Sequence, residues 1–265
     1  MANAAKYLEL AEQLATYIRE ECEPGDRFPK VADLALQHGV APNTASRAVQ
    51  TLKEQGLLSG KPGGSTWVRV PPVQSVRRNT RYQTEKDLVL QPEEQRRSTG
   101  VAELDTGIRL ASMHESDVHL DVVPAPADVA EALELTEGSL VLRRTSTRRH
   151  RRGAGVSKSV SYMPHDLASR NPDLFDKSKE PWPGGAQHQL HTVGVEVGRI
   201  EDHLTATMPT DTEIEEQDIP PAVPVIRVRK VTYSTTGQIV EIADIPLPAD
   251  RVKLVYVTEL EPWNG

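Results

Sequence analysis

The sequence predicts an α+β fold in two parts, a small N-terminal helical domain and a larger C-terminal domain built on an antiparallel sheet. Three observations support this. The first 56 residues repeat apolar side chains at helical spacing in three segments. A Gly-rich turn then joins two short β-type segments. Beyond residue 100, β-branched runs dominate and short helical patterns interrupt them, which is typical of antiparallel pairs with a few helices.

Three helices are expected in the N-terminal domain. Residues 4–21 carry an apolar stripe at helical spacing. A second helix of about two turns spans Val31–His38. The third begins at Pro42, which suits the first helical position, and ends at Gly56, and it has a polar and basic face. Its buried stripe is expected to consist of Ala45, Ala48, Val49 and Leu52.

The second and third helices, joined by a Gly-containing turn, form a helix-turn-helix, a motif that places its second helix in the major groove of DNA. The Gly-rich segment Gly60–Val68 follows. It is not a nucleotide-binding loop, because Lys61 precedes the glycines and a strand follows instead of a helix. We expect a β-hairpin wing whose glycines let the backbone approach the sugar-phosphate chain of DNA.

The charge is unevenly distributed along the chain. The formal net charge is −7, but residues 1–81 hold 11 Lys or Arg against 8 Asp or Glu, a balance of +3, so the remainder carries −10. A basic segment on an acidic body is compatible with DNA as a partner.

The composition indicates a soluble, cytoplasmic protein with no membrane partner. No apolar run approaches the roughly 18 residues of a membrane span, and the N-terminus lacks the order of a signal peptide. Cys22 is the only cysteine, which excludes an intramolecular disulfide and fits a reducing compartment.

The segment GDRFPKVADLALQHGVAPNTASRAVQTLKEQGLLSGKPGGSTWV, from Gly25 to Val68, resembles the winged helix-turn-helix of the GntR family of bacterial transcription regulators. The resemblance implies a double-stranded DNA operator as partner. It departs from the family pattern at Ala41-Pro42 and Gly64-Ser65, among other positions. The residues expected to contact DNA are Lys30, Asn43, Thr44, Ser46, Arg47, Gln50, Lys53, Lys61, Gly63 and Gly64.

The C-terminal half combines strands with short helices. Residues 119–144 contain a strand, a Pro turn, a helix at 127–135 and a second strand. Residues 224–252 contain two strands around a Thr-Thr-Gly turn, and residues 254–260 a final strand. With SYMP at 161–164, these segments resemble UTRA, the chorismate-lyase-like sensor domain of the HutC subfamily of the same regulators.

This resemblance implies a three-part organisation of the chain. We expect a winged helix-turn-helix domain at 1–72, a solvated linker at 73–100 and a UTRA-like domain for effector binding and dimerisation at 101–265. Arg77, Arg78 and Arg81 in the linker offer an alternative role in phosphate contact.

The resemblance also implies an effector cleft over the sheet. Two of its positions lack the charge that the family often has there, which favours a less charged effector or none. The alternative is that the tyrosines are half-buried sheet residues and the glutamate an exposed ladder charge. The effector-binding positions carried over are Thr147, Arg149, Ser159, Tyr162, Tyr233 and Glu241.

Other chemistry has little support in the sequence. Metal ligation by His188 and His191 would require a helix, whereas the valines that follow indicate a strand, and we expect no metal site. No catalytic elbow or nucleotide fingerprint occurs, so we expect no enzyme, catalytic residue or cofactor.

Six arginines and a histidine crowd residues 143–153. Strand alternation sends Arg143 and Arg149 to one face and Arg144 and Arg148 to the other. We expect a solvated hairpin end facing the acidic body, with a second nucleic-acid contact as the alternative.

Three hypotheses follow. The first is a dimeric repressor that a small-molecule effector releases from a palindromic operator. The second is a repressor of the same fold without an effector, as in plasmid maintenance or transfer. The third, with least support, is a metal-binding enzyme that uses the C-terminal half.

Lys61→Ala tests the wing. Loss of one phosphate contact should lower the slope of log affinity against log salt concentration by about one unit, measured in operator titrations at several salt concentrations. An unchanged slope would remove Lys61 from the interface.

Overall fold

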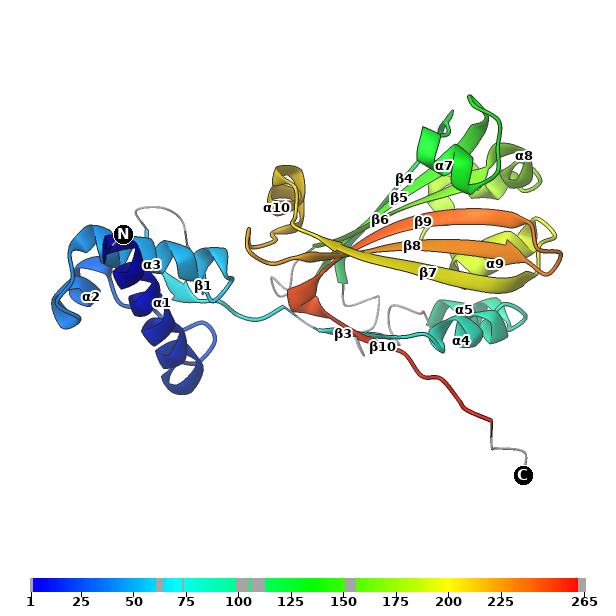
Figure 1. The fold of residues 1–265 in the computed structure, drawn as a ribbon. Coiled ribbons are helices and arrows are strands. Elements are labelled where there is room, and N and C mark those ends of the chain that lie inside the picture. The colour runs from blue at the N-terminus through cyan, green and yellow to red at the C-terminus, as the bar shows by residue number, and fades with distance from the viewer. Residues whose placement is uncertain are drawn as a thin grey trace. The chain divides into compact units, whose positions relative to one another are not determined.

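The computed structural model describes residues 2–60, 64–72, 74–98, 105, 113–150 and 156–261. The chain forms two compact units (Figure 1). We call Met1–Pro72 with Met208–Pro224 the helical unit, and Val73–Thr207 with Val225–Gly265 the sheet unit. Among the described residues, no helix is both long and apolar enough to cross a bilayer.

The helical unit is the predicted helix-turn-helix with a two-stranded wing. The three helices begin and end within two residues of their expected bounds, and the wing strands pair antiparallel, with Leu58 opposite Val68. The loop that joins two strands of the sheet unit contributes a short helix, tied to this unit by the bond from Ala222 N–H to the Glu54 carbonyl (2.9 Å). The elements are α1 (Ala2–Glu21), α2 (Val31–Gln37), α3 (Pro42–Glu54), β1 (Leu58–Ser59), β2 (Trp67–Val68) and α10 (Asp211–Gln217).

An apolar core holds the three helices and the wing together. Helix α3 contributes the predicted stripe, and Ala45, Ala48 and Leu52 are fully buried. They pack with Leu14 of α1 and Leu34 of α2. The helical periodicity of the sequence therefore accounts for α1, α2 and α3.

The sheet unit is built on a six-stranded antiparallel sheet in the order β4-β5-β6-β9-β8-β7. Helix α7 packs on one face, and α8 and α9 pack on the other. The elements are β4 (Met113–Pro124), α7 (Ala127–Ala132), β5 (Leu140–His150), β6 (Val156–Pro164), α8 (His165–Ala168), η2 (Pro172–Phe175), η3 (Lys177–Lys179), α9 (Gly185–Thr192), β7 (Val197–Thr207), β8 (Val225–Ser234), β9 (Ile239–Pro248) and η4 (Ala249–Arg251).

Strand alternation gives the sheet two different faces. On the α7 face, Val141, Val231 and Ile242 meet Val129 and other apolar residues. We call the opposite face the inner face. There, Leu142, Met163 and Val240 pack against α8 and α9 in an apolar cluster. Polar residues continue the inner face beyond that cluster, and they form the candidate site described below.

The segment expected to be a solvated linker is folded. It contains β3 (Ser75–Arg78), α4 (Arg81–Leu88) and α5 (Glu93–Ser98). Lys86 of α4 donates to the Val197 carbonyl (2.7 Å), so the helix is attached to the sheet. The sequence conceals this because polar contacts hold α4, and polar contacts leave no hydrophobic periodicity.

The last strand is shorter than predicted. We expected a strand over 254–260, but β10 spans only Val252–Val255 and pairs in parallel with β3. Beyond β3, the Asn79 side chain takes over: its amide donates to the Val257 carbonyl (2.9 Å) and its oxygen accepts from the Val257 N–H (3.0 Å). The side chains that follow, including Tyr256 and Leu260, are exposed.

Leu52→Ala should destabilise the helical unit by about 3 kcal/mol, because it leaves a cavity at a fully buried position of α3. Calorimetric unfolding of the full chain measures the loss. Leu36→Ala is the control, since Leu36 is 83% exposed and should cost little. Equal effects of the two substitutions would contradict the assigned core.

Candidate DNA-binding face and sensor cavity

Helix α3 presents one exposed polar face. Asn43, Ser46, Arg47 and Gln50 are all exposed, and their spacing of three, four and seven residues places them on the same side of the helix. Pro42 begins the helix, which leaves Asn43 and Ser46 in the first turns. Those turns are the part of a recognition helix that meets base edges.

A stacking contact positions one side chain of this face. The Arg47 guanidinium lies 4.2 Å from the centre of the Tyr7 ring on α1. Such a cation–π contact limits the freedom of a long side chain while its donors remain available. Gln50 donates to Glu54 (3.1 Å) on the same helix.

The other residues expected to contact DNA differ in exposure. Lys30 before α2 and Gly64 in the wing are exposed. Thr44 is only 6% exposed and belongs to the packed side of α3. Lys53 donates to the Gly60 carbonyl (3.2 Å), which ties α3 to the wing. Lys61 and Gly63 lie outside the described residues.

The wing has an anchor that the sequence did not reveal. Arg27, just before α2, donates to the Ser65 hydroxyl (3.2 Å), and its backbone forms an isolated antiparallel β-bridge with Trp67.

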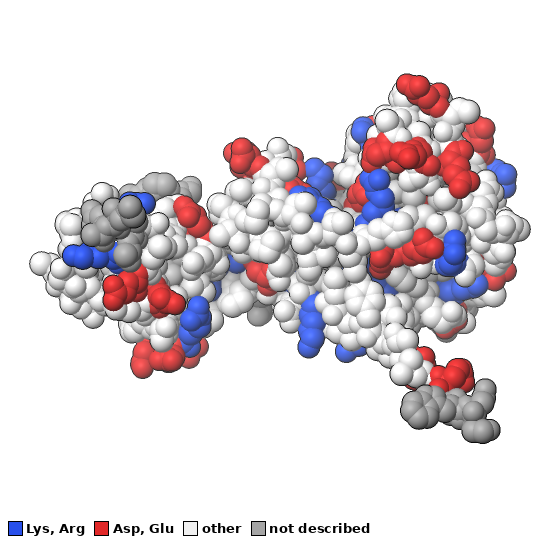
Figure 2. Space-filling model, viewed as in Figure 1, with Lys and Arg blue, Asp and Glu red and all other residues white. Residues whose placement is uncertain are grey.

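Figure 2 shows basic and acidic side chains mixed on the visible face of the helical unit, whereas acidic side chains gather around α7 of the sheet unit.

The inner face of the sheet carries a row of polar side chains. Strand pairing places Arg144 opposite Ser161 and Ser146 opposite Ser159, and residues directly opposite share a face. Glu241 of β9 lies opposite Thr232 of β8, and Lys230 lies two residues before Thr232 on the same strand. Polar groups of β5, β6, β8 and β9 therefore meet beneath the helices.

A small cavity opens within this row. Its volume is about 10 Å³, which is room for a single water. Four polar side chains share its wall with three apolar ones. The lining residues are Leu142, Arg144, Ser161, Met163, Leu174, Gln189 and Glu241.

A buried ion pair borders the cavity. Lys230 Nζ lies 2.7 Å from Glu241 Oε2, and the two residues are 8% and 3% exposed. Thr232 donates to the same carboxylate (3.4 Å). Burial alone lowers the pKa of Lys230, but the carboxylates of Glu241 and Glu85 outweigh burial, so the pKa is raised from its ordinary value.

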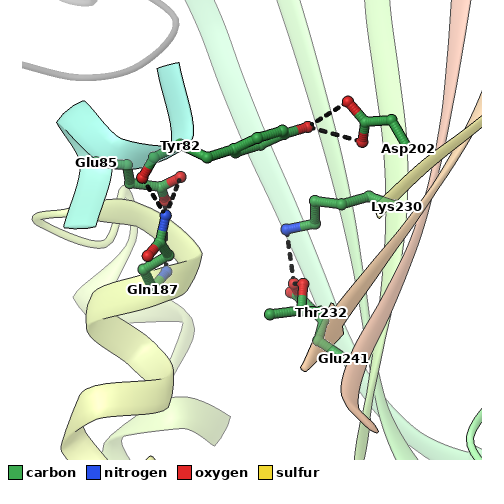
Figure 3. A network of polar contacts seen from close by, with 7 residues as sticks. All are labelled: Tyr82, Glu85, Gln187, Asp202, Lys230, Thr232 and Glu241. Carbon is green, nitrogen blue, oxygen red and sulfur yellow. Dashed lines mark hydrogen bonds and ion pairs between the residues drawn. The ribbon is translucent and has the colours of Figure 1, made fainter. Parts of the chain in front are cut away.

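Helix α4 extends this polar network (Figure 3). Tyr82 donates to both carboxylate oxygens of Asp202 on β7 (2.8 Å each), and burial and that carboxylate raise the pKa of Tyr82 to about 12. Gln187 of α9 donates to the Tyr82 carbonyl (2.8 Å) and to Glu85, which is 7% exposed. Helices α4 and α9 are thus joined by polar contacts.

Comparisons with known proteins identify both units. The UTRA domain matches residues 113–253, and the gntR family of bacterial regulatory proteins matches residues 6–68. The HTH-type transcriptional regulator SCO4628 of Streptomyces coelicolor is 26% identical over 253 residues, covering 91% of this chain and 87% of that protein. The HTH-type transcriptional regulator YhcF of Bacillus subtilis is 33% identical over 63 residues, 23% of this chain and 52% of its own length.

Structural similarity agrees with these matches. A GntR-family transcriptional regulator of known crystal structure superimposes with a TM-score of 0.60 at 22% identity, over 97% of this chain and 98% of that one. The UTRA match alone covers more than half of the 265 residues. This chain belongs to the GntR family and carries a UTRA domain. Like its relatives, it is a DNA-binding transcriptional regulator and not an enzyme.

The residues expected to bind an effector lie on both faces of the UTRA sheet. Glu241 lines the cavity, and Ser159 shares the inner face through its pairing with the buried Ser146. Tyr162 and Tyr233 pack with the apolar cluster under α7. Thr147 and Arg149 also alternate away from the inner face, because Arg144 and Ser146 occupy it.

Sequence reasoning missed most of the cavity wall of the UTRA domain. Arg144 belongs to the arginine-rich run, and alternation did separate it from Arg143 and Arg149, but alternation does not tell which face is covered. Tyr82 and Glu85 lie in the segment expected to be a linker. No local pattern identifies Gln189 as a cavity residue or Lys230 as the partner of Glu241.

His188 and His191 lie in helix α9, where we had not placed a helix, with ring centres 6.1 Å apart. Burial and nearby Arg96 lower the pKa of His188 to about 4, and the neutral ring accepts a bond from the Trp182 indole N–H (2.9 Å). Within the described residues, no three His, Cys, Asp or Glu side chains group as metal ligands.

Lys230→Met should destabilise the UTRA domain by about 3–5 kcal/mol, because it leaves Glu241 buried without a charge partner. The double variant Lys230→Met/Glu241→Leu should recover most of this loss.

The stability that Lys230 contributes should also depend on pH. Because folding raises the pKa of Lys230, this stability is fully present below the ordinary lysine pKa of 10.5 and declines as the pH rises above 10.5. Denaturant unfolding at pH 7 and pH 11 measures the effect.

Lys177→Met is the matched control. It breaks the ion pair with Asp117, whose side chains are 64% and 69% exposed, and should cost less than about 1 kcal/mol. If the two lysine substitutions cost the same, the Lys230–Glu241 pair is not the buried interaction described here.

Proposed function

We propose that this regulator is a dimeric repressor of the HutC type that acts in the cytoplasm. Its helical unit binds a palindromic operator, and a small-molecule effector in the UTRA domain releases it. The observation that carries the proposal is the combination of an exposed polar face on α3 with a buried polar cavity in a separate unit.

The α3 face has the side chains that a recognition helix needs. Arginine bonds guanine in a bidentate manner, and asparagine and glutamine bond adenine in the same way. Arg47, Asn43 and Gln50 are of these types and are exposed together. Two copies of the chain would place two such helices on successive half-sites, which requires a palindromic operator.

The cavity supports an effector because a buried polar wall is a poor way to stabilise a sheet. Apolar residues of similar volume would serve stability as well or better than the Lys230–Glu241 pair. Binding sites, by contrast, combine apolar walls with a few converging polar groups, as this cavity does.

Helix α4 offers a route from the cavity to the DNA-binding unit. It begins three residues after β3, which leads directly from the helical unit, and its Tyr82 and Glu85 belong to the polar network beside the cavity. An effector that binds one arrangement of this network more tightly shifts the population toward it.

A second candidate is a repressor of the same fold that responds to no small molecule. One observation favours it: the cavity as it stands has room for about one water. Thermal unfolding with and without a metabolite panel separates the two, since stabilisation by operator DNA alone would support the second candidate.

Arg47→Ala should weaken operator binding by about 1–3 kcal/mol, the loss expected when a base-reading arginine is removed. Sequencing the DNA that the wild-type protein retains would first identify the operator, and gel-shift titrations at fixed salt then compare affinities. Arg97→Ala is the control, because Arg97 is an exposed arginine of the sheet unit paired with Glu93. Wild-type affinity in the Arg47 variant would contradict the proposed reading face.

A further inference from the structure

The guanidinium of Arg144, which lines the cavity, is already paired with a carboxylate of the same chain, that of Glu180. Arg144 Nε donates to Glu180 Oε1 (2.8 Å), and Arg144 Nη2 donates to Glu180 Oε2 (2.7 Å). The side chain of Glu180 is 7% exposed and that of Arg144 is 22% exposed. The pair is therefore largely removed from water, and both donors are directed at one carboxylate.

Glu180 reaches Arg144 from a surface segment and not from the sheet. It lies between η3 and α9, and its neighbours Lys179 and Pro181 are exposed. The Trp182 backbone N–H donates to Glu180 Oε2 (2.9 Å) and orients the carboxylate. Glu180 belongs to no strand, so no strand pairing holds it against Arg144.

The geometry of the pair matches what an anionic ligand would make. The guanidinium fork fits two oxygens of a carboxylate or a phosphate, with shorter and stronger bonds than neutral partners form. An incoming anion could replace Glu180 oxygen for oxygen, so Arg144 would not be left buried and unpaired. The displaced carboxylate would regain its hydration, which lowers the cost of exchange.

We propose that Glu180 is an internal competitor for the effector: it holds Arg144 in the effector-free protein, and an anionic effector displaces it. The effector class is a small molecule with a carboxylate or a phosphate monoester. Glu241 and Gln189 line the same cavity and can accept from hydroxyl or amino groups of its remainder. This inference rests on the proposed function, whose effector it assigns to a chemical class.

The competitor sets the apparent affinity. A ligand that binds only the open state has an apparent dissociation constant equal to the intrinsic one divided by the open fraction. Glu180→Gln keeps the volume and an oxygen for the Trp182 N–H but removes the charge that binds Arg144. Since charge-assisted bonds are roughly twice as strong as neutral ones, we expect at least about tenfold tighter anion binding.

Calorimetric titration of the full chain with acetate and with inorganic phosphate, at constant ionic strength set with chloride, tests the inference. Glu180→Gln should bind one of the two at least about tenfold more tightly than wild type. The anion that gains more distinguishes a carboxylate from a phosphate effector. The double variant Arg144→Gln/Glu180→Gln should lose this gain.

Glu93→Gln is the matched control, because Glu93 also pairs with an arginine, Arg97, but on the surface. It should bind both anions as wild type does. A wild-type measurement is independent of whether the variants fold: saturating anion should shift the backbone amide resonance of Trp182, which loses its bond to Glu180.

Two results would overturn the inference: equal anion affinity of Glu180→Gln and wild type, or an unmoved Trp182 resonance at saturating anion. Operator binding by the same samples keeps this separate from the proposed function. A wild-type protein that binds its operator but shows no Glu180-dependent anion binding defeats only the inference. A wild-type protein that binds no operator defeats the proposed function itself.

Discussion

Buried charge requires a partner, and this requirement organises the sheet unit. The inner face of the sheet carries Arg144, Lys230 and Glu241, each at a position that helices cover. An unpaired charge at such a position costs several kcal/mol, so each needs an opposite charge within contact distance. Glu180 meets that need for Arg144, and Glu241 and Lys230 meet it for each other.

The same requirement explains why the segment after β3 folds onto the sheet. Helix α4 has almost no apolar stripe, yet three hydrogen bonds attach it to its neighbours. Tyr82 donates to Asp202, Gln187 donates to Glu85, and Lys86 donates to the Val197 carbonyl. Polar contacts depend strongly on distance and angle. A change in the charges of the cavity therefore changes the energy of the contacts that hold α4 more than an equal change in apolar packing would.

The helical unit follows a different physical logic. Its core is mainly apolar, although Thr44 and Gln217 are buried there too, and α3 presents Asn43, Arg47 and Gln50 on the surface. One surface side chain of this unit is held in place: the Tyr7 ring stacks on the Arg47 guanidinium and orders it in the absence of DNA. The helical unit thus relies on apolar packing, whereas the inner face of the sheet relies on paired polar groups.

Local pattern in the sequence was sufficient for α1 to α3 and the wing of the helical unit, for α7 with its flanking strands, and for the pair β8 and β9, because periodicity and turn residues report directly on whether a segment is helix or strand. It also separated Arg144 from Arg149 by alternation. Only the tertiary structure decided that the face with Arg144 is the covered one, that Glu180 reaches it from a distant loop, and that α4 folds onto the sheet. Those outcomes depend on strand register and on polar contacts between residues up to 120 positions apart, as for Tyr82 and Asp202, and neither leaves a trace in a local window of sequence.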